Sequence, residues 1–210
     1  MLLIESPHNE RFKKLLKLST DNKFRRKSKL FIIEGLKEIR AALEHNYELE
    51  EVYIDDKYKT AFPEKEFDQV SVTILKHDLF SRLVYREDAS YILAVLKEPV
   101  LDLSQIQLPE NPLIIILENI EKPGNLGALL RTCDAVGADA VILSQDHHNF
   151  FHPNVIRSSV GTVFSNQIAY AGAEEIKLWC KENNIKVYAA ALQTDKFYTD
   201  MDYTSGTAFV

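Results

Sequence analysis

Residues 113–132 read LIIILENIEKPGNLGALLRT, and this stretch decides the fold class. The apolar run 113–117 is typical of a strand that is buried on both faces of a parallel sheet. A turn rich in polar residues follows, and the spacing after it predicts a helix over 125–136. Open α/β sheets bind ligands where their strands end, so Asn125 and Arg131 are candidate site residues.

The chain after residue 112 continues to alternate between strand and helix patterns, which is typical of a parallel sheet with helices on both faces. The predicted order is strand 113–117, helix 125–136, strand 139–144, helix 153–159, strand 162–169, helix 173–184, strand 186–192 and strand 207–210.

A smaller α/β unit precedes this sheet and is predicted to span residues 1–97. Its expected elements are helix 9–18, strand 30–33, helix 36–44, strand 49–54, strand 70–75, helix 77–84 and strand 91–96. Residues 98–112 contain three prolines and several polar residues, which is typical of a linker. We therefore expect two domains, 1–97 and 113–210, joined by the linker 98–112.

Positive charge is concentrated near the N-terminus. Residues 1–40 contain 11 Lys or Arg and 5 Asp or Glu, which is a net charge of +6. Because the whole chain has a net charge of −6, residues 41–210 carry −12. The densest basic segment, 23–29, is predicted to be a loop with five cations: Lys23, Arg25, Arg26, Lys27 and Lys29. Local positive charge suits nucleic-acid phosphates, although an ordinary solvated face would look the same.

The composition excludes several other classes of protein. No apolar run reaches the roughly 18 residues of a membrane span, and no signal peptide is recognisable, so we expect a cytoplasmic protein. Cys133 and Cys180 lack metal-ligand spacing and are expected to be buried on helices. His147, His148 and His152 come without a placed carboxylate, so we expect an exposed histidine loop and no metal.

The turn at 124–127, taken alone, is a Gly-x-x-Gly pattern that lacks the spacing of a dinucleotide or phosphate-binding loop. Its glycines are equally consistent with a tight turn and close packing of the helix against the sheet. Asn125 and Arg131 are six residues apart and fall on different helical faces unless Asn125 is a helix cap. We expect Asn125 to be that cap.

The segment resembles the first signature of the SpoU branch of the SPOUT RNA methyltransferases. The matching residues are Glu118, Asn119, Pro123, Asn125, Gly127, Ala128 and Arg131. Residues 157–161 are similar to the Arg-x-Ser-x-Gly segment of that family, and the basic N-terminal region resembles its substrate-binding domain.

This resemblance implies a SPOUT-type domain with a trefoil knot, a homodimer, and transfer of a methyl group from S-adenosylmethionine to a ribose 2′-oxygen in ribosomal or transfer RNA. It implies that Arg131 and Asn125 are catalytic. It also implies that the active site is shaped by Glu118, Asn119, Gly127, Arg157 and Ser159. Of these, Arg157 and Ser159 would face the RNA cleft. One wall of the methyl-donor pocket is implied at Ala190, Ala191 and Leu192. We expect Arg131 to position a phosphate, because a guanidinium is rarely deprotonated.

The later signatures of the family, a Gly-x-Glu-x-x-Gly turn and a Ser-Leu-Asn segment, would follow Val210. The resemblance therefore implies that the knotting segment and part of the methyl-donor pocket are absent from these residues. A truncated or inactive RNA-binding protein is one alternative, and a nucleotide-dependent transferase is another. The second is disfavoured by the missing phosphate-loop patterns.

Overall fold

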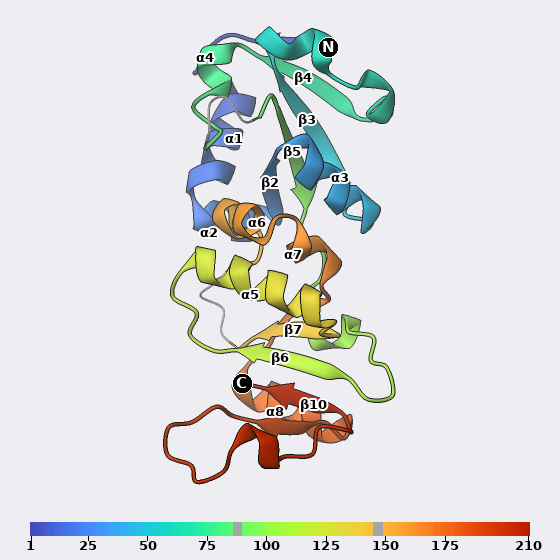
Figure 1. The fold of residues 1–210 in the computed structure, drawn as a ribbon. Helices are drawn as coiled ribbons and strands as arrows, with labels where there is room; N and C mark the ends of the chain where they lie inside the picture. Colours follow the sequence, from blue (N-terminus) through green and yellow to red (C-terminus); the bar gives the residue numbers. More distant parts are fainter. Residues whose placement is uncertain (86–89, 145–148) are drawn as a thin grey trace.

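Two five-stranded sheets, one above the other, organise the computed structural model, which describes residues 1–85, 90–144 and 149–210 (Figure 1). The N-terminal sheet has the order β1-β4-β3-β5-β2. Its strands are β1 (Leu2–Ile4), β2 (Leu30–Glu34), β3 (Leu49–Asp55), β4 (Ser71–Leu75) and β5 (Ile92–Lys97). Strands β1, β4 and β3 run parallel, and β5 pairs antiparallel with both β3 and β2.

Among the described residues, the α-helices of this half are α1 (Glu10–Thr20), α2 (Asn22–Ser28), α3 (Leu36–Glu44) and α4 (His77–Phe80). One side of α1 is apolar, with Phe12, Leu15 and Leu18 buried in the same cluster as Ile32 of β2. Because this spacing places the apolar residues on one face of the helix, α1 covers the sheet and leaves its lysines in solvent.

The C-terminal sheet has the order β8-β7-β6-β10-β9, and all of its strand pairs are parallel. Its strands are β6 (Leu113–Leu117), β7 (Ala140–Leu143), β8 (Ile168–Tyr170), β9 (Lys186–Tyr188) and β10 (Thr207–Phe209). The connecting helices are α5 (Pro123–Val136), α6 (Pro153–Ser159), α7 (Thr162–Ser165) and α8 (Ala173–Glu182).

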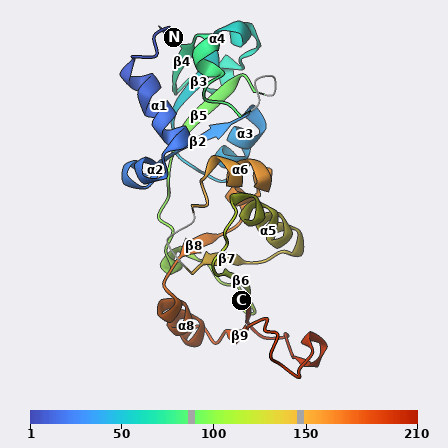
Figure 2. The ribbon, with the colours of Figure 1, turned by 90° about the vertical axis from the view of Figure 1, so that its left-hand side faces the viewer.

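Helices cover both faces of this second sheet (Figures 1 and 2). Leu126 and Leu130 of α5 belong to the same buried cluster as Val141 of β7. On the other face, Ile176 of α8 belongs to a cluster with Ile114 of β6. The predicted α/β class with a parallel C-terminal sheet is therefore confirmed, and so is the burial of Cys133 and Cys180 on helices.

Aromatic side chains join the two halves. Phe31 of β2 stacks on Phe151, which precedes α6, with ring centroids 4.3 Å apart and an interplanar angle of 14°. Tyr47 meets Phe164 of α7 edge to face at 5.0 Å. Because these rings belong to one buried cluster or pack against it, the hydrophobic core continues from one half into the other.

Two of the expected elements were wrong. The basic segment 23–29 is mostly helical, because Asp21 caps α2 by accepting the Phe24 N–H at 3.1 Å and the cations near its end suit the helix dipole. The expected strand 162–169 consists of α7, a turn and the short strand β8. Gly161 begins α7 with a φ of 89°, and Val163 is as well buried in a helix as in a strand.

Other boundaries differ by less. The helix expected over 77–84 ends at Phe80, the strand expected over 186–192 ends at Tyr188, and the short strand β1 was not predicted. Within the described residues, no helix is both long and apolar enough to cross a membrane.

Helix α5 packs against α6 at Gly127, where no side chain can be accommodated. A Cβ atom at this position would collide with the Ser158 hydroxyl and would lie 2.8 Å from both Ser158 Cβ and the Ser159 backbone nitrogen. Close packing was expected between this helix and the sheet, whereas the close contact of Gly127 is with α6. Gly124 makes no such contact, because a Cβ atom there would meet nothing within 4 Å.

We predict that Gly127→Ala lowers the free energy of unfolding by about 1–3 kcal/mol, because the added methyl group forces α5 and α6 apart. The matched control is Gly124→Ala, which should be neutral or stabilise α5 by up to about 1 kcal/mol. Urea unfolding of both variants measures the difference. Equal stability of the two variants would contradict the close contact.

Candidate functional site

The candidate site is built from the carboxyl end of β6, the middle strand of the C-terminal sheet. Strand order changes direction there, since β7 lies on one side of β6 and the late strand β10 on the other. Glu118 and Asn119 follow the strand and are exposed, and Asn119 has a φ of 52°, which asparagine tolerates better than most residues. Such a switch point is where parallel sheets form ligand crevices.

Asn125 does not cap the helix, so this prediction was wrong. Lys122 is the N-cap of α5, Pro123 occupies the first turn, and the Asn125 N–H donates to the Lys122 carbonyl at 3.0 Å. Asn125 and Arg131 therefore both lie within the helix, separated by about 9 Å of rise and on different faces. The structure does not bring the two side chains together on one compact ligand.

Arg131 is exposed on α5 and makes no hydrogen bond or ion pair with the described residues. Its neighbours on the buried side of the helix, Leu130 and Cys133, pack into the core and fix the backbone that carries it. A guanidinium in this setting is available to an incoming anion, for which its planar fork is well suited.

The two candidate residues of α6 have different environments. Ser159 is fully buried and donates to the Ile156 carbonyl at 2.8 Å, so the expectation that it faces the RNA cleft was wrong. Arg157 is partly exposed, with Cζ 3.6 Å from the centroid of the Tyr85 ring, and it donates a hydrogen bond to the Asn154 side chain. This stacking holds the guanidinium plane and leaves its other N–H groups available for binding.

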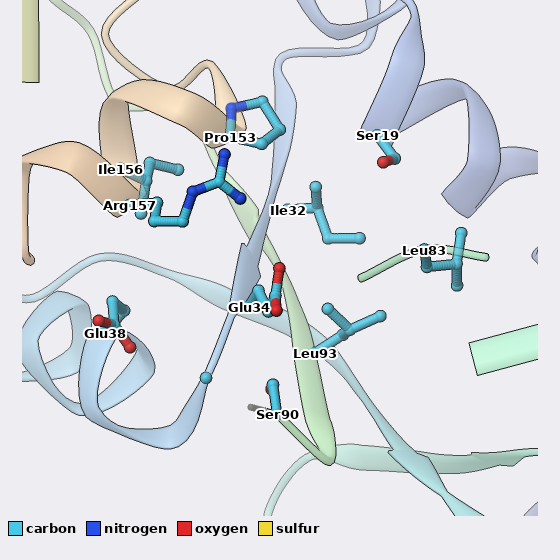
Figure 3. A pocket seen from close by; sticks show the side chains of 11 residues that line it. Ser19, Ile32, Glu34, Glu38, Leu83, Ser90, Leu93, Pro153, Ile156 and Arg157 are labelled. Atoms are coloured by element: carbon cyan, nitrogen blue, oxygen red, sulfur yellow. The ribbon is translucent and has the colours of Figure 1, made fainter. Parts of the chain in front are cut away.

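Arg157 lines a cavity between the two halves of the molecule (Figure 3). Two carboxylates also line it, Glu34 at the end of β2 and Glu38 on α3, and neither was predicted from the sequence. These two residues follow or lie within elements that were predicted, strand 30–33 and helix 36–44, but nothing local in the sequence predicts that α6 packs opposite them.

A second cleft, of roughly 540 Å³, lies beyond the carboxyl ends of β9 and β10. Ala190 and Ala191 line it, as expected, whereas Leu192 is 98% exposed and does not. Its aromatic residues pack against one another, with Tyr188 and Tyr203 centroids 5.0 Å apart and Phe209 5.2 Å from Tyr203.

The basic residues of α2 do not share one environment. Arg25 is 1% exposed and donates through Nη1 to the carbonyls of Leu18 and Ser19, at 2.6 and 3.2 Å, so its predicted contact with RNA was wrong. Burial lowers the pKa of Arg25. Lys23, Arg26, Lys27 and Lys29 are exposed, and Lys29 forms an ion pair with Glu98 at 3.0 Å.

His152 is the N-cap of α6 and accepts the Asn154 N–H through Nδ1 at 3.1 Å. Burial, followed by the nearby cations Arg25 and Arg157, lowers the pKa of His152 below its usual 6.5. The other two histidines considered for a metal, His147 and His148, lie outside the described residues. Within the described part, no cluster of three or more His, Cys, Asp or Glu side chains could hold a metal ion.

Two family models match the chain in the same two regions that hold the sheets. The SpoU rRNA Methylase family model matches residues 112–210, and the MRM3-like substrate binding domain model matches residues 9–94. Residues 112–210 therefore form a domain of the SpoU rRNA methylase family.

Two relatives with known names are ribosomal RNA methyltransferases. The chain is 29% identical over 210 residues to the 23S rRNA (guanosine(2553)-2′-O)-methyltransferase RlmP of Bacillus subtilis, covering 100% of this chain and 82% of the relative. It is 27% identical over 161 residues to the 23S rRNA (uridine(2479)-2′-O)-methyltransferase of Streptomyces viridochromogenes, covering 75% of this chain and 56% of the relative.

The fold is also that of solved SpoU methyltransferases. The crystal structure of AviRb from Streptomyces viridochromogenes, in complex with AdoMet, aligns with a TM-score of 0.88 at 24% identity. The alignment covers 96% of this chain and 80% of that chain. The likeness extends over both sheets, so that structure shares the fold of the N-terminal half as well.

The N-cap role of His152 predicts a dependence of stability on pH. Because the folded protein binds the His152 proton less readily than the unfolded chain, acidification through the usual value of 6.5 should favour unfolding. His152→Asn keeps a good cap and removes this proton uptake, so its stability should fall less between about pH 7.5 and about pH 5.5. Thermal unfolding across this range, with the exposed His8→Asn as control, measures the effect; parallel curves for wild type and His152→Asn would refute it.

Proposed function

We propose that this protein is an S-adenosylmethionine-dependent methyltransferase that acts on a ribose 2′-oxygen of ribosomal or transfer RNA. The observation that carries the proposal is the position of the family signature. Its residues from Glu118 to Arg131 run from the carboxyl end of the central parallel strand into α5, in a domain of the SpoU family. Relatives named as 23S rRNA 2′-O-methyltransferases support the substrate class.

The cleft beyond β9 and β10 fits the adenine end of the methyl donor. Its volume of roughly 540 Å³ is within the usual range of ligand sites, and aromatic rings next to alanines leave room for a flat heterocycle. Ala190, Ala191 and Tyr188 would hold it. S-adenosylmethionine, when bound, supplies an electrophilic methyl group on a sulfonium.

Arg131 is proposed to hold a phosphate of the RNA rather than to remove a proton. Its exposed guanidinium has no protein partner within the described residues, and near neutrality such a group stays charged. Gripping a phosphate through two N–H groups would align the ribose oxygen with the methyl group, and alignment alone accelerates such reactions strongly. Asn125, Glu118 and Asn119 would bind other parts of the same substrate.

The exposed lysines of α2, Lys23 and Lys27, are proposed to bind RNA phosphates. They project from the half of the chain that matches a substrate binding domain. We also propose a homodimer in the cytoplasm, and the exposed apolar residues Val187, Phe197 and Tyr198 of the C-terminal half support association with a second copy. Light scattering of the purified protein would measure the oligomeric state.

Replacing Arg131 with Lys should reduce methyl transfer to ribosomal RNA transcripts at least about tenfold, because lysine lacks the planar fork. Incorporation of labelled methyl groups measures transfer, and calorimetric titration measures S-adenosylmethionine binding, which should be unchanged. Arg40→Lys, an exposed arginine on α3, is the control. Wild-type transfer by Arg131→Lys would reject the assigned role, and RNA binding without any transfer by the wild type would favour an inactive RNA-binding protein.

Neutralising the two lysines of α2 in Lys23→Gln/Lys27→Gln should weaken RNA binding and reduce its dependence on salt, by a slope of roughly 0.7–0.9 for each phosphate that the variant no longer binds. Fluorescence anisotropy at several salt concentrations measures both quantities. The control Lys177→Gln/Lys181→Gln removes the same charge from α8. An unchanged slope in the α2 variant would exclude these lysines from the RNA interface.

A further inference from the structure

The cavity between the two halves of the molecule has the form of a binding pocket for a flat molecule. Its volume is roughly 340 Å³, at the lower end of the range for small-ligand sites. Apolar side chains from several regions form its walls, namely Ile32 of β2, Leu83, Leu93 of β5 and Ile156 of α6 (Figure 3). Such walls suit an aromatic ring that has left its stack.

The charged groups of the cavity do not neutralise one another. Figure 3 shows that Glu34 reaches the cavity from β2 and Arg157 reaches it from α6. Among the described residues, neither Glu34 nor Glu38 forms an ion pair with Arg157, and Glu38 makes no hydrogen bond. Glu34 accepts the Tyr85 N–H through one oxygen at 3.0 Å and keeps the other oxygen available.

The polar groups of the cavity match the edge of one nucleobase. Guanine presents two adjacent donors, its N1–H and its 2-amino group, beside the acceptor O6. A carboxylate can accept from both donors, while a guanidinium can donate to the oxygen. We propose that this cavity binds a guanine base of the RNA substrate, with Glu34 and Glu38 accepting from its donors and Arg157 donating to its O6. The proposal rests on RNA being the substrate, as proposed above.

The other bases and the phosphate groups fit less well. Adenine and cytosine place a ring-nitrogen acceptor beside their single amino group, and this acceptor would face a carboxylate. Uracil offers one donor between two carbonyl oxygens. A phosphate would be repelled, because the cavity contains two carboxylates and one guanidinium. An unpaired acceptor that faces a partly buried carboxylate costs more binding free energy than a missing hydrogen bond does. The cavity should therefore bind guanine in preference to the other bases.

A base in this cavity would be held in fixed register with the candidate catalytic helix. Arg157 is followed directly by Ser158, and Ser158 is in contact with the Gly127 backbone position on α5. Gly127 lies between Asn125 and Arg131 on that helix. A base bound beside Arg157 on α6 would therefore help to set the position of the reacting ribose beside α5, because the two helices pack against each other.

The test compares the 5′-monophosphates of guanosine and inosine, which differ only in the 2-amino group. Binding to the full chain is measured by NMR titration at millimolar concentration. Guanosine monophosphate should bind at least about tenfold more tightly, which is the effect of one hydrogen bond to a charged group. Glu38→Gln and Glu34→Gln should each reduce this ratio towards one, because an amide presents a donor where the base also donates.

The control is Glu44→Gln, an exposed glutamate at the end of α3 that does not line the cavity, and it should keep the wild-type ratio. Thermal unfolding verifies that each variant is folded. This control matters for Glu34→Gln because the Glu34 carboxylate accepts a hydrogen bond from the Tyr85 N–H. Equal affinities for the two nucleotides, no binding of either, or an unchanged ratio in both cavity variants would overturn the proposal. Because no methyl transfer is measured, an inactive protein that discriminates the nucleotides would reject the proposed enzymatic function and leave the guanine pocket intact.

Discussion

The stacking of Phe31 on Phe151 is the contact on which the arrangement of this molecule depends. It joins the edge strand of one sheet to the residue that precedes α6, with ring centroids 4.3 Å apart. On its other side, α6 is locked against α5 at Gly127. A short helix held from both sides cannot shift without opening the core, since tightly packed interiors do not deform gradually. The two halves therefore act as one rigid support, and the cavity between them has a defined shape.

The proposed function divides nucleic-acid recognition between two parts of this arrangement. The lysines of α2 lie on an open surface, where contacts with phosphates contribute affinity but carry no information about sequence. The cavity beside Arg157 is lined by apolar walls and carboxylates, which repel phosphates and accept from the donors of a base. Electrostatic attraction over the surface and selection within the cavity thus do not compete. The negative charge of the chain as a whole is no obstacle, because only the local field matters.

Periodicity predicted the parts of the fold that depend on local pattern. The apolar run before the signature became β6, and Pro153 after His152 started the helix 153–159 as expected. What failed depends on distant contacts. The burial of Arg25 follows from the free carbonyls at the end of α1, and a basic run seen in isolation resembles a solvated loop. The role of Glu34 was equally hidden, because its partner surface on α6 lies more than a hundred residues away in sequence.

The two arginines at positions 25 and 131 show why charge in the sequence does not identify a binding residue. Arg25 uses its donors on the carbonyls of Leu18 and Ser19, so its charge stabilises the junction of α1 and α2 and is withdrawn from solvent. Arg131 has a rigid helix beneath it and no partner for its guanidinium within the described residues. Its orientation must then come from the substrate. If alignment is the main source of rate, an arginine that becomes ordered only when a phosphate arrives links catalysis to correct binding. The base cavity strengthens this link, since it fixes the RNA on the same pair of helices that carries Arg131.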